Sequence, residues 1–285
     1  MSRSENVNDP AVDGAHWVLP SGAALIKHPL CMLARPTLLR YQHANDFRFF
    51  EATLVLSLSG QLTLESDNRI WELADTQTLM VVAKNTTVNI QKTPGQDSSA
   101  FRSVFLALAP DVITEFYQRY GQGIRPSSAV APCTITTLDE DLSDTLHYCI
   151  RGIDAAIEFE QLANRLMGLL LALNERGIIF PRPSAAGLGE RLKHLLGMAP
   201  EKYWTAAKAG RELAVSEATL RRRLAEEGVN FSHLLTEIRM HHAMMLLQTT
   251  NFSVSQIADA CGYRALSRFS MRFKSRFGFS PSNIR

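Results

Sequence analysis

The chain has little of what a disulfide-stabilised or membrane-spanning protein needs. Its four cysteines are far apart and form no C-x-x-C pair, which argues against a disulfide framework or a zinc site and favours a reducing compartment. The polar N-terminus carries no apolar stretch of the kind found in a signal peptide. No run approaches the roughly 20 apolar residues that span a bilayer. We therefore expect a cytoplasmic protein that does not contact a membrane.

Signals of catalysis are absent as well. The chain has no nucleophile–base arrangement and no phosphate-binding loop. A metal-dependent enzyme built on a cupin barrel would carry a His-x-His pair followed by a Glu, whereas His16, His28 and His43 are isolated. We predict no metal, no cofactor and no enzymatic activity. The competing hypothesis, a cupin-type oxygenase or isomerase with an accessory C-terminal domain, would require bound iron or manganese.

Charge is distributed unevenly along the chain. Its 285 residues are enough for two domains, and the net charge is only +2. Residues 1–189 contain 15 Lys and Arg against 20 Asp and Glu, whereas residues 190–285 contain 15 against 8. This asymmetry predicts that only the C-terminal part contacts a polyanion.

Residues 15–180 read as a regulatory domain that begins with strands and ends with helices. Short β-branched and apolar runs with turns between them, spaced by about 8–12 residues, predict a small barrel or jelly roll. These runs are Thr53–Leu58, Gln61–Glu65, Arg69–Leu73, Leu79–Val82, Thr87–Gln91 and Phe101–Leu108. The period then changes to that of helices. The expected helices are Asp111–Tyr120, Asp139–Arg151 and Glu158–Arg176.

The last of these helices carries one apolar stripe. Its members, which repeat at helical spacing, are Leu162, Leu166, Leu169, Leu170 and Leu173. The stripe either covers the barrel or forms the seam of a homodimer through Leu162, Leu166, Leu169 and Leu173. The sequence leaves both interpretations open.

Two further segments complete the domain plan. Residues 1–14 are polar and are expected to form a disordered tail. Residues 181–189 contain two prolines and small residues without apolar periodicity, which predicts a linker close to the point where the charge changes sign. Residues 190–285 then form the basic C-terminal domain.

Two segments of the C-terminal domain share a helix–turn–helix layout. In the first, a helix over Thr205–Leu213 leads to Ser216, a natural N-cap, and to a helix over Glu217–Glu227. In the second, Ser255–Cys261 precedes a helix over Leu266–Phe277. A small residue in each first helix, Gly210 or Ala258, would let the second helix cross closely. An amphipathic helix, Phe231–Gln248, would hold the two units about one DNA turn, ~34 Å, apart.

The second helix of each unit has one apolar face and one cationic face. Leu220 and Leu224 must be buried in the first unit, and Phe269, Phe273 and Phe277 must be buried in the second. Polar and cationic side chains then occupy the remaining faces, where arginine can read guanine and Lys or Arg can neutralise phosphate. Those of interest are Arg221, Arg222, Arg223, Ser267, Arg268, Arg272 and Lys274.

With these motifs in order, Trp204–Arg285 resembles the DNA-binding domain of the AraC/XylS family of bacterial transcription regulators. The matching pieces are Ser216-x3-Leu220-x-Arg222-x-Leu224, Arg239-Met240-x2-Ala243, Ile257-Ala258-x2-Cys261-Gly262-Tyr263 and Phe269-x3-Phe273-Lys274 with Phe277-Gly278-x-Ser280-Pro281. The resemblance implies an α+β chain: an N-terminal cupin-like β-barrel with a helical dimerisation element, a linker, and a C-terminal all-α domain with two helix-turn-helix units.

The resemblance also implies which residues contact bases. The family's positions fall on Ala218, Arg221 and Arg222 in the first unit and on Ser267, Arg268 and Met271 in the second. Met271 departs from the basic residue that many members carry, so base reading by the second unit differs here. Ile284 stands where the family often has a tyrosine.

The implied function is a sequence-specific regulator, and an activator in most relatives, with promoter DNA and RNA polymerase as partners. A small-molecule effector would bind the barrel. Polar residues that could hold an anionic effector such as a carboxylate are Lys27, His28, Arg40, His43 and Arg48. The remaining alternative is a protein that binds DNA without reading its sequence.

Overall fold

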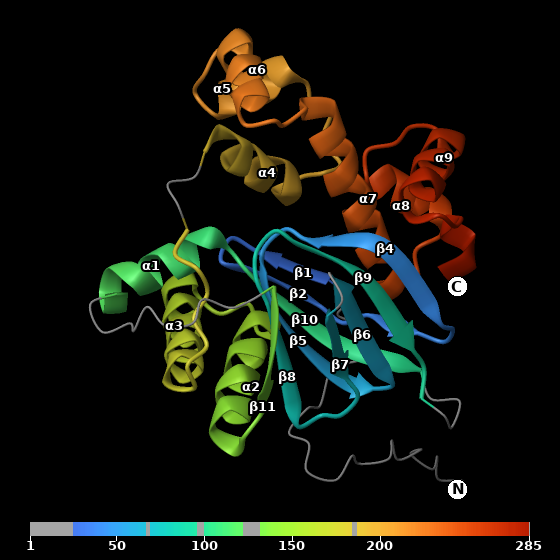
Figure 1. Cartoon of the computed structure of the whole chain (residues 1–285). Helices are drawn as coiled ribbons and strands as arrows, with labels where there is room; N and C mark the ends of the chain where they lie inside the picture. Colours follow the sequence, from blue (N-terminus) through green and yellow to red (C-terminus); the bar gives the residue numbers. More distant parts are fainter. Residues whose placement is uncertain (1–24, 67–68, 96–99, 122–131, 184–186, 285) are drawn as a thin grey trace, which may run out of the picture.

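The computed structural model describes residues 25–66, 69–95, 100–121, 132–183 and 187–284. Figure 1 shows a sheet-rich N-terminal domain beneath a group of helices. The predicted tail, residues 1–14, and His16 lie outside the described residues. None of the described helices is long and apolar enough to cross a membrane.

Two antiparallel sheets form the N-terminal domain. The larger sheet contains β1 (Leu25–His28), β2 (Cys31–Ala34), β3 (Thr37–Leu38), β5 (Ala52–Ser59), β8 (Thr78–Val82), β10 (Phe101–Leu108) and β11 (Cys133–Thr137). The smaller sheet contains β4 (Gln42–Phe49), β9 (Thr86–Thr93), β6 (Gln61–Ser66) and β7 (Arg69–Leu73). No ladder joins the two sheets within the described ranges, so the predicted α+β fold is confirmed but the strands form a sandwich and not a closed barrel.

The central strand β5 explains why both faces of the larger sheet are apolar. Leu54 and Leu56 point to the face that the helices cover, whereas Val55 points to the smaller sheet. Because side chains alternate along a strand, burial on both faces requires a continuous apolar run. Edge strand β7 is the contrast, since four of its five residues, Arg69–Glu72, are exposed or half-buried.

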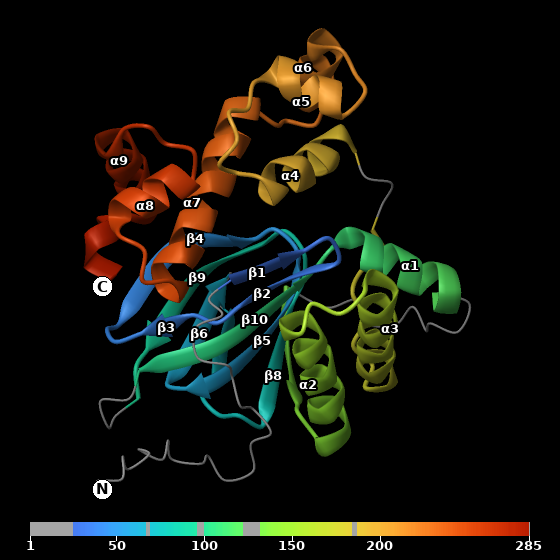
Figure 2. The same cartoon turned by 180° about the vertical axis from the view of Figure 1, so that it is seen from behind.

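Helices α1 (Pro110–Tyr120), α2 (Glu140–Asp154) and α3 (Phe159–Glu175) cover the outer face of the larger sheet (Figures 1 and 2). Helix α1 begins at a proline, which has no N–H to leave unpaired at this position. Helix α2 begins after Asp139, whose side chain accepts a hydrogen bond of 2.9 Å from the Leu142 N–H.

The leucine stripe of α3 belongs to this internal core. Leu162, Leu166, Leu169 and Leu173 are each at most 1% exposed and pack with the sheet and α2. Of the two interpretations that the sequence left open, burial favours the one in which the stripe covers the sheet, because these side chains are already buried within one copy of the chain.

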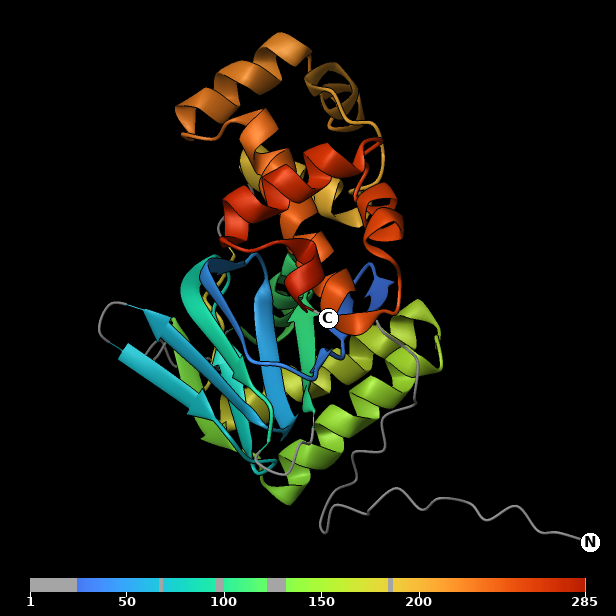
Figure 3. The same ribbon diagram turned by 90° about the vertical axis from the view of Figure 1, so that its right-hand side faces the viewer.

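The C-terminal domain consists of helices stacked on one end of the two sheets (Figure 3). They are α4 (Leu188–Met198), α5 (Ala206–Glu212), α6 (Glu217–Glu226), α7 (Phe231–Thr249), α8 (Val254–Ala260) and α9 (Leu266–Phe277), followed by a 3-10 turn, Pro281–Ile284. Helix α4 already begins at Leu188, two residues inside the segment expected to be linker. Residues 184–186 of that segment lie outside the described ranges.

Helix α7 divides its buried residues between two cores. Leu234 and Ile238 pack with α4, α5 and α6. The apolar residues between Met240 and Leu247 pack with α8 and α9 and reach the sandwich interior. At 1.5 Å per residue, the 19 residues of α7 extend about 28 Å, so one rigid element connects both helix pairs.

Candidate nucleic-acid interface and ligand cavity

The first helix pair, α5 and α6, is fixed by two caps and one close crossing. The Thr205 and Ser216 hydroxyls each accept a backbone hydrogen bond of 3.1 Å, from Lys208 and Thr219. At Gly210 of α5, a Cβ atom would lie 2.8 Å from the carbonyl oxygen of Val215. Glycine therefore permits the close approach that the sequence predicted.

Helix α6 buries Leu220 and Leu224 and exposes its other sides. The residues predicted to meet DNA that lie on those exposed sides are Ala218, Arg221, Arg222 and Arg223. Arg221 pairs with Glu217 at 2.8 Å and Arg222 with Glu226 at 2.6 Å, each one helical turn away. Exposed pairs of this kind contribute at most about 1 kcal/mol, so both guanidinium groups can exchange a carboxylate for a stronger acceptor.

The second helix pair, α8 and α9, is held in the same way. Ser253 and Gln256 form a reciprocal capping box at the start of α8. Gly262 follows the helix with φ +74°, and a Cβ atom there would lie 2.6 Å from a guanidinium nitrogen of Arg239. Gly278 ends α9 in the left-handed conformation.

Helix α9 buries Phe269, Phe273 and Phe277 as one stripe, as predicted. Its exposed residues include all those expected to contact DNA, namely Ser267, Arg268, Met271, Arg272 and Lys274. No acidic residue occurs in the helix. Helices α6 and α9 lie towards opposite ends of α7 (Figures 1 and 2), so the chain presents two separate cationic helix faces.

A cavity of about 200 Å³ lies between the sandwich and the C-terminal helices. Most of its lining residues are apolar, and they include Phe47 and Phe49 of β4, Phe50 just after it, Phe105 of β10, and Ile238 and Met245 of α7. Three cationic side chains also line it: Lys27 of β1, Arg48 of β4 and Lys193 of α4. An apolar cavity with a few polar groups is the usual form of a small-molecule site.

The cavity contains three of the five residues expected to hold an effector. Lys27, His28 and Arg48 line it, whereas exposed Arg40 and half-buried His43 do not. Its other polar residues were not predicted. Glu51 and Thr53 come from the sandwich, and Lys193, His194, His241 and His242 come from α4 and α7. The sequence pattern of α4 and α7 predicts only that these helices support the DNA-binding units. Helical periodicity does not indicate which residues line a cavity shared with another domain.

Ion pairs beside the cavity fasten α4 to the sandwich. The Nζ of Lys84 lies 2.6 Å from Glu190 of α4 and 3.5 Å from Glu51. Lys193 pairs with the same Glu190 and also donates to Asn85 at 3.4 Å. Burial raises the pKa of Glu51 to about 7, although Lys84 opposes the shift.

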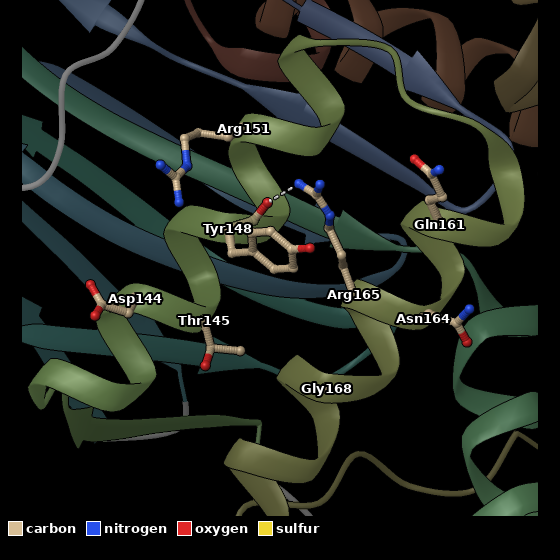
Figure 4. A pocket seen from close by; sticks show the side chains of 8 residues that line it. All are labelled: Asp144, Thr145, Tyr148, Arg151, Gln161, Asn164, Arg165 and Gly168. Carbon is tan, nitrogen blue, oxygen red and sulfur yellow. Dashed lines mark hydrogen bonds between the residues drawn. The ribbon is translucent and has the colours of Figure 1, made fainter.

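A second, more open groove lies between α2 and α3 (Figure 4). Arg165 points across it to α2, donating to the Tyr148 carbonyl oxygen at 2.7 Å, and its guanidinium lies 3.6 Å from the centre of the Tyr148 ring. Because this arginine already has an acceptor and a stacked ring, the groove offers a ligand less than the interdomain cavity does.

In the described part of the chain, no three His, Cys, Asp or Glu side chains gather in a way that could hold a metal ion. All four cysteines are buried. Burial raises the pKa of each thiol to about 12, which keeps it protonated and unreactive.

Comparison with known proteins adds to this geometry. A family model described as a helix-turn-helix domain matches residues 209–285, which include α6 to α9. The regulator GadX of Escherichia coli K12 is 31% identical over 154 residues, covering 48% of this chain and 56% of GadX. The urease operon transcriptional activator of Escherichia coli is 32% identical over 121 residues, 41% of each chain. The chain thus spans about half the length of these curated relatives, or less.

Among solved structures, ToxT of Vibrio cholerae resembles almost the whole chain. An apo form superposes with a TM-score of 0.59 at 17% identity, covering 90% of this chain and 97% of ToxT. At this identity the likeness concerns the fold alone, a sheet-rich domain followed by a helical one. The motifs of residues 204–285, the matching family model and the related regulators agree on a helix-turn-helix domain of the AraC/XylS type in the C-terminal part of this chain.

Proposed function

We propose that this protein is a sequence-specific DNA-binding transcription regulator that responds to a small molecule through its N-terminal domain. The observation that carries the proposal is the pair of exposed cationic helices, α6 and α9, each supported by its own apolar core. The relatives are themselves regulators by name, and one is a transcriptional activator. Activation, with RNA polymerase as a partner, is part of this proposal.

In the proposed complex, α6 and α9 enter two adjacent major-groove segments. Ala218, Arg221 and Arg222 read bases from α6, and Ser267, Arg268 and Met271 read them from α9. Arg223, Arg272 and Lys274 contact phosphates. A homodimer would use a surface other than the leucine stripe of α3, because that stripe is buried.

The test is selection of bound duplexes from a random DNA pool by the purified chain, followed by affinity measurements at several salt concentrations. We expect one enriched motif, and we expect Arg222→Ala to weaken binding to it by ~1–3 kcal/mol. Arg102→Ala is the matched control, because Arg102 is exposed on β10, far along the chain from both units. Binding without any enriched motif, which vanishes uniformly as salt rises, would reject sequence-specific regulation.

For the effector, we propose an amphiphile with a carboxylate head bound in the interdomain cavity. The apolar lining suits a hydrocarbon tail. Lys27, Arg48 and Lys193 suit an anion and outnumber the acidic lining residue Glu51, whose pKa burial raises to about 7. Structures of ToxT with an unsaturated fatty acid and with a substituted butenoic acid support this chemistry. A volume of about 200 Å³ corresponds to roughly seven water-sized groups, so we choose octanoate as the probe.

A further inference from the structure

His241 of α7 occupies an aromatic enclosure at the wall of the interdomain cavity. Its ring centre lies 5.0 Å from those of Phe47 and Phe50 and 5.7 Å from that of Phe277. The residue is only 6% exposed. The imidazole therefore has little access to solvent, and its two nitrogens must find partners within the protein or in the cavity.

One ring nitrogen has a partner and the other does not. Nε2 lies 3.3 Å from an Nη atom of Arg276 in α9 and 3.7 Å from a carboxylate oxygen of Glu237, which is beyond hydrogen-bond distance. A guanidinium can only donate, so Nε2 accepts and the proton of the neutral ring is on Nδ1. Burial lowers the pKa of His241, which keeps the ring neutral. Among the described residues no acceptor meets the buried Nδ1.

Arg48, which also lines the cavity, has a second unpaired donor of the same kind. Its Nη atom donates to Asn85 at 3.1 Å, but its buried Nε meets no acceptor in the described part of the chain. A buried donor without an acceptor destabilises the folded protein, because it has lost its hydrogen bond to water without gaining another. Both donors belong to residues that line the same cavity, so a ligand with an acceptor group there would satisfy them.

We propose that the carboxylate of the effector accepts hydrogen bonds from Nδ1 of His241 and Nε of Arg48, and that His241 transmits its binding to the second helix-turn-helix unit. This inference rests on the proposed effector function and adds to it the residue that couples the cavity to α9. The coupling runs through the opposite edge of the imidazole, because an acceptor at Nδ1 makes Nε2 a stronger acceptor for Arg276.

Arg276 is placed to pass this change to DNA binding, because it joins three elements. From α9 it donates to both carboxylate oxygens of Glu237 in α7, at 2.8 and 2.9 Å. It also donates to the carbonyl oxygen of Asp46 at 2.6 Å, where β4 bulges and Asp46 has φ +51°. A stronger bond to His241 alters how Arg276 holds α9 against α7 and the sandwich.

The first test needs no variant. In the full chain labelled with ¹⁵N-histidine, we expect one neutral imidazole protonated at Nδ1, and we expect that nitrogen to shift when octanoate is added. Octylammonium, whose head group cannot accept a hydrogen bond, should leave the resonance unchanged. A ring protonated at Nε2, or no response to octanoate at saturating concentration, would overturn the inference.

The second test separates binding from transmission. We expect His241→Phe, which keeps an aromatic ring, to weaken octanoate binding by roughly ten-fold or more. Arg276→Lys should bind octanoate within about three-fold of wild type. In wild type, octanoate should change affinity for the selected DNA motif by about five-fold or more, and in Arg276→Lys that change should be lost. Calorimetry measures the first effect and duplex titration the second.

The outcomes distinguish this inference from the proposed function. Unchanged octanoate affinity in His241→Phe, or a full DNA response in Arg276→Lys, would overturn the coupling while leaving a DNA-binding regulator intact. Failure of wild type to select any DNA motif would overturn the proposed function, whatever the imidazole does. His242→Phe is the matched control, because His242 also lines the cavity but has no contact with Arg276 among the hydrogen bonds of the described residues.

Discussion

The Nζ atom of Lys92 on β9 lies 2.5 Å from Oε1 of Gln248 on α7. Lys92 is only 2% exposed, and its partner is a neutral amide. Gln248 in turn donates to Gln42 of β4, which extends the hydrogen bonds across the boundary between the sandwich and the C-terminal helices. The rings of Phe101 and Phe105, 5.9 and 5.1 Å from Nζ, are the other neighbours of the amine. A buried amine therefore joins the two domains.

This amine makes stability depend on pH in a defined direction. Burial lowers the pKa of Lys92 to about 7, whereas an unfolded lysine titrates near ~10.4. Between these values the unfolded chain holds a proton that the folded chain has lost, so the contribution of Lys92 to the free energy of unfolding rises with pH. We measure the free energy of unfolding of wild type and of Lys92→Met in urea. We expect the wild-type value minus the Lys92→Met value to rise by about 2 kcal/mol from pH 7 to pH 9.

Lys274→Met serves as the control for this experiment, because Lys274 is exposed on α9. Its difference from wild type should stay constant across the same pH range. Parallel curves for wild type and Lys92→Met would mean that Lys92 remains charged in the folded protein.

Two helical glycines should respond oppositely to alanine. A Cβ at Gly210 would meet the Val215 carbonyl oxygen at 2.8 Å, whereas a Cβ at Gly168 of α3 would meet nothing within 4 Å. Alanine is the better helix former by about 1 kcal/mol. We expect Gly168→Ala to stabilise the chain by ~0.5–1 kcal/mol and Gly210→Ala to destabilise it by ~1–3 kcal/mol. Chemical unfolding measures both, and stabilisation by both would contradict the close crossing of α5 and α6.

A charge in the leucine stripe should disrupt folding and not assembly. Leu166 is completely buried, so Leu166→Glu places a carboxylate in the core and should destabilise the chain by ~4 kcal/mol or more. Asn164→Glu is the matched control, because Asn164 is exposed on the same helix. Circular dichroism and sedimentation measure the two effects. A folded Leu166→Glu monomer formed from a wild-type dimer would restore the seam interpretation.

The sequence predicts local structure here better than it predicts contacts between domains. Arg69–Leu73, Phe101–Leu108 and Leu266–Phe277 have the same bounds in the structure as in the sequence pattern, because side-chain periodicity reflects which face of an element is buried. The same pattern could not place Lys92, which follows the predicted run Thr87–Gln91 and whose type is usually exposed. Its burial results from a second domain that covers the end of the sandwich.

The residues of the cavity also divide into those that the sequence could predict and those that only the packing of the two domains reveals. Lys27, His28 and Arg48 could be proposed from residue type, since cations suit an anionic effector. His241 and Arg276 could not, because each lies on a helix whose own pattern is that of a scaffold or a DNA-reading element. Only the packing of α7 and α9 against β4 brings them beside the cavity.

The exposed face of α9 leads to a final prediction about DNA specificity. Arg268 and Met271 lie one helical turn apart and both are exposed, Met271 by 62%. An arginine can donate two hydrogen bonds to guanine, whereas a methionine offers only an apolar contact, which suits the thymine methyl group. We expect Arg268→Ala to weaken binding to the selected motif by ~1–3 kcal/mol and to relax the preference at one base pair.

Met271→Ala should cost less, and Met271→Arg should create a new preference for guanine at the position that Met271 faces. Competition titrations at fixed salt, with single base-pair changes in the motif, measure each preference. Arg272→Ala is the control for phosphate contact, since it should lower affinity for all sequences alike and reduce the salt slope by about one. If all three positions changed affinity uniformly, α9 would contact only the backbone, and sequence recognition would rest on α6 alone.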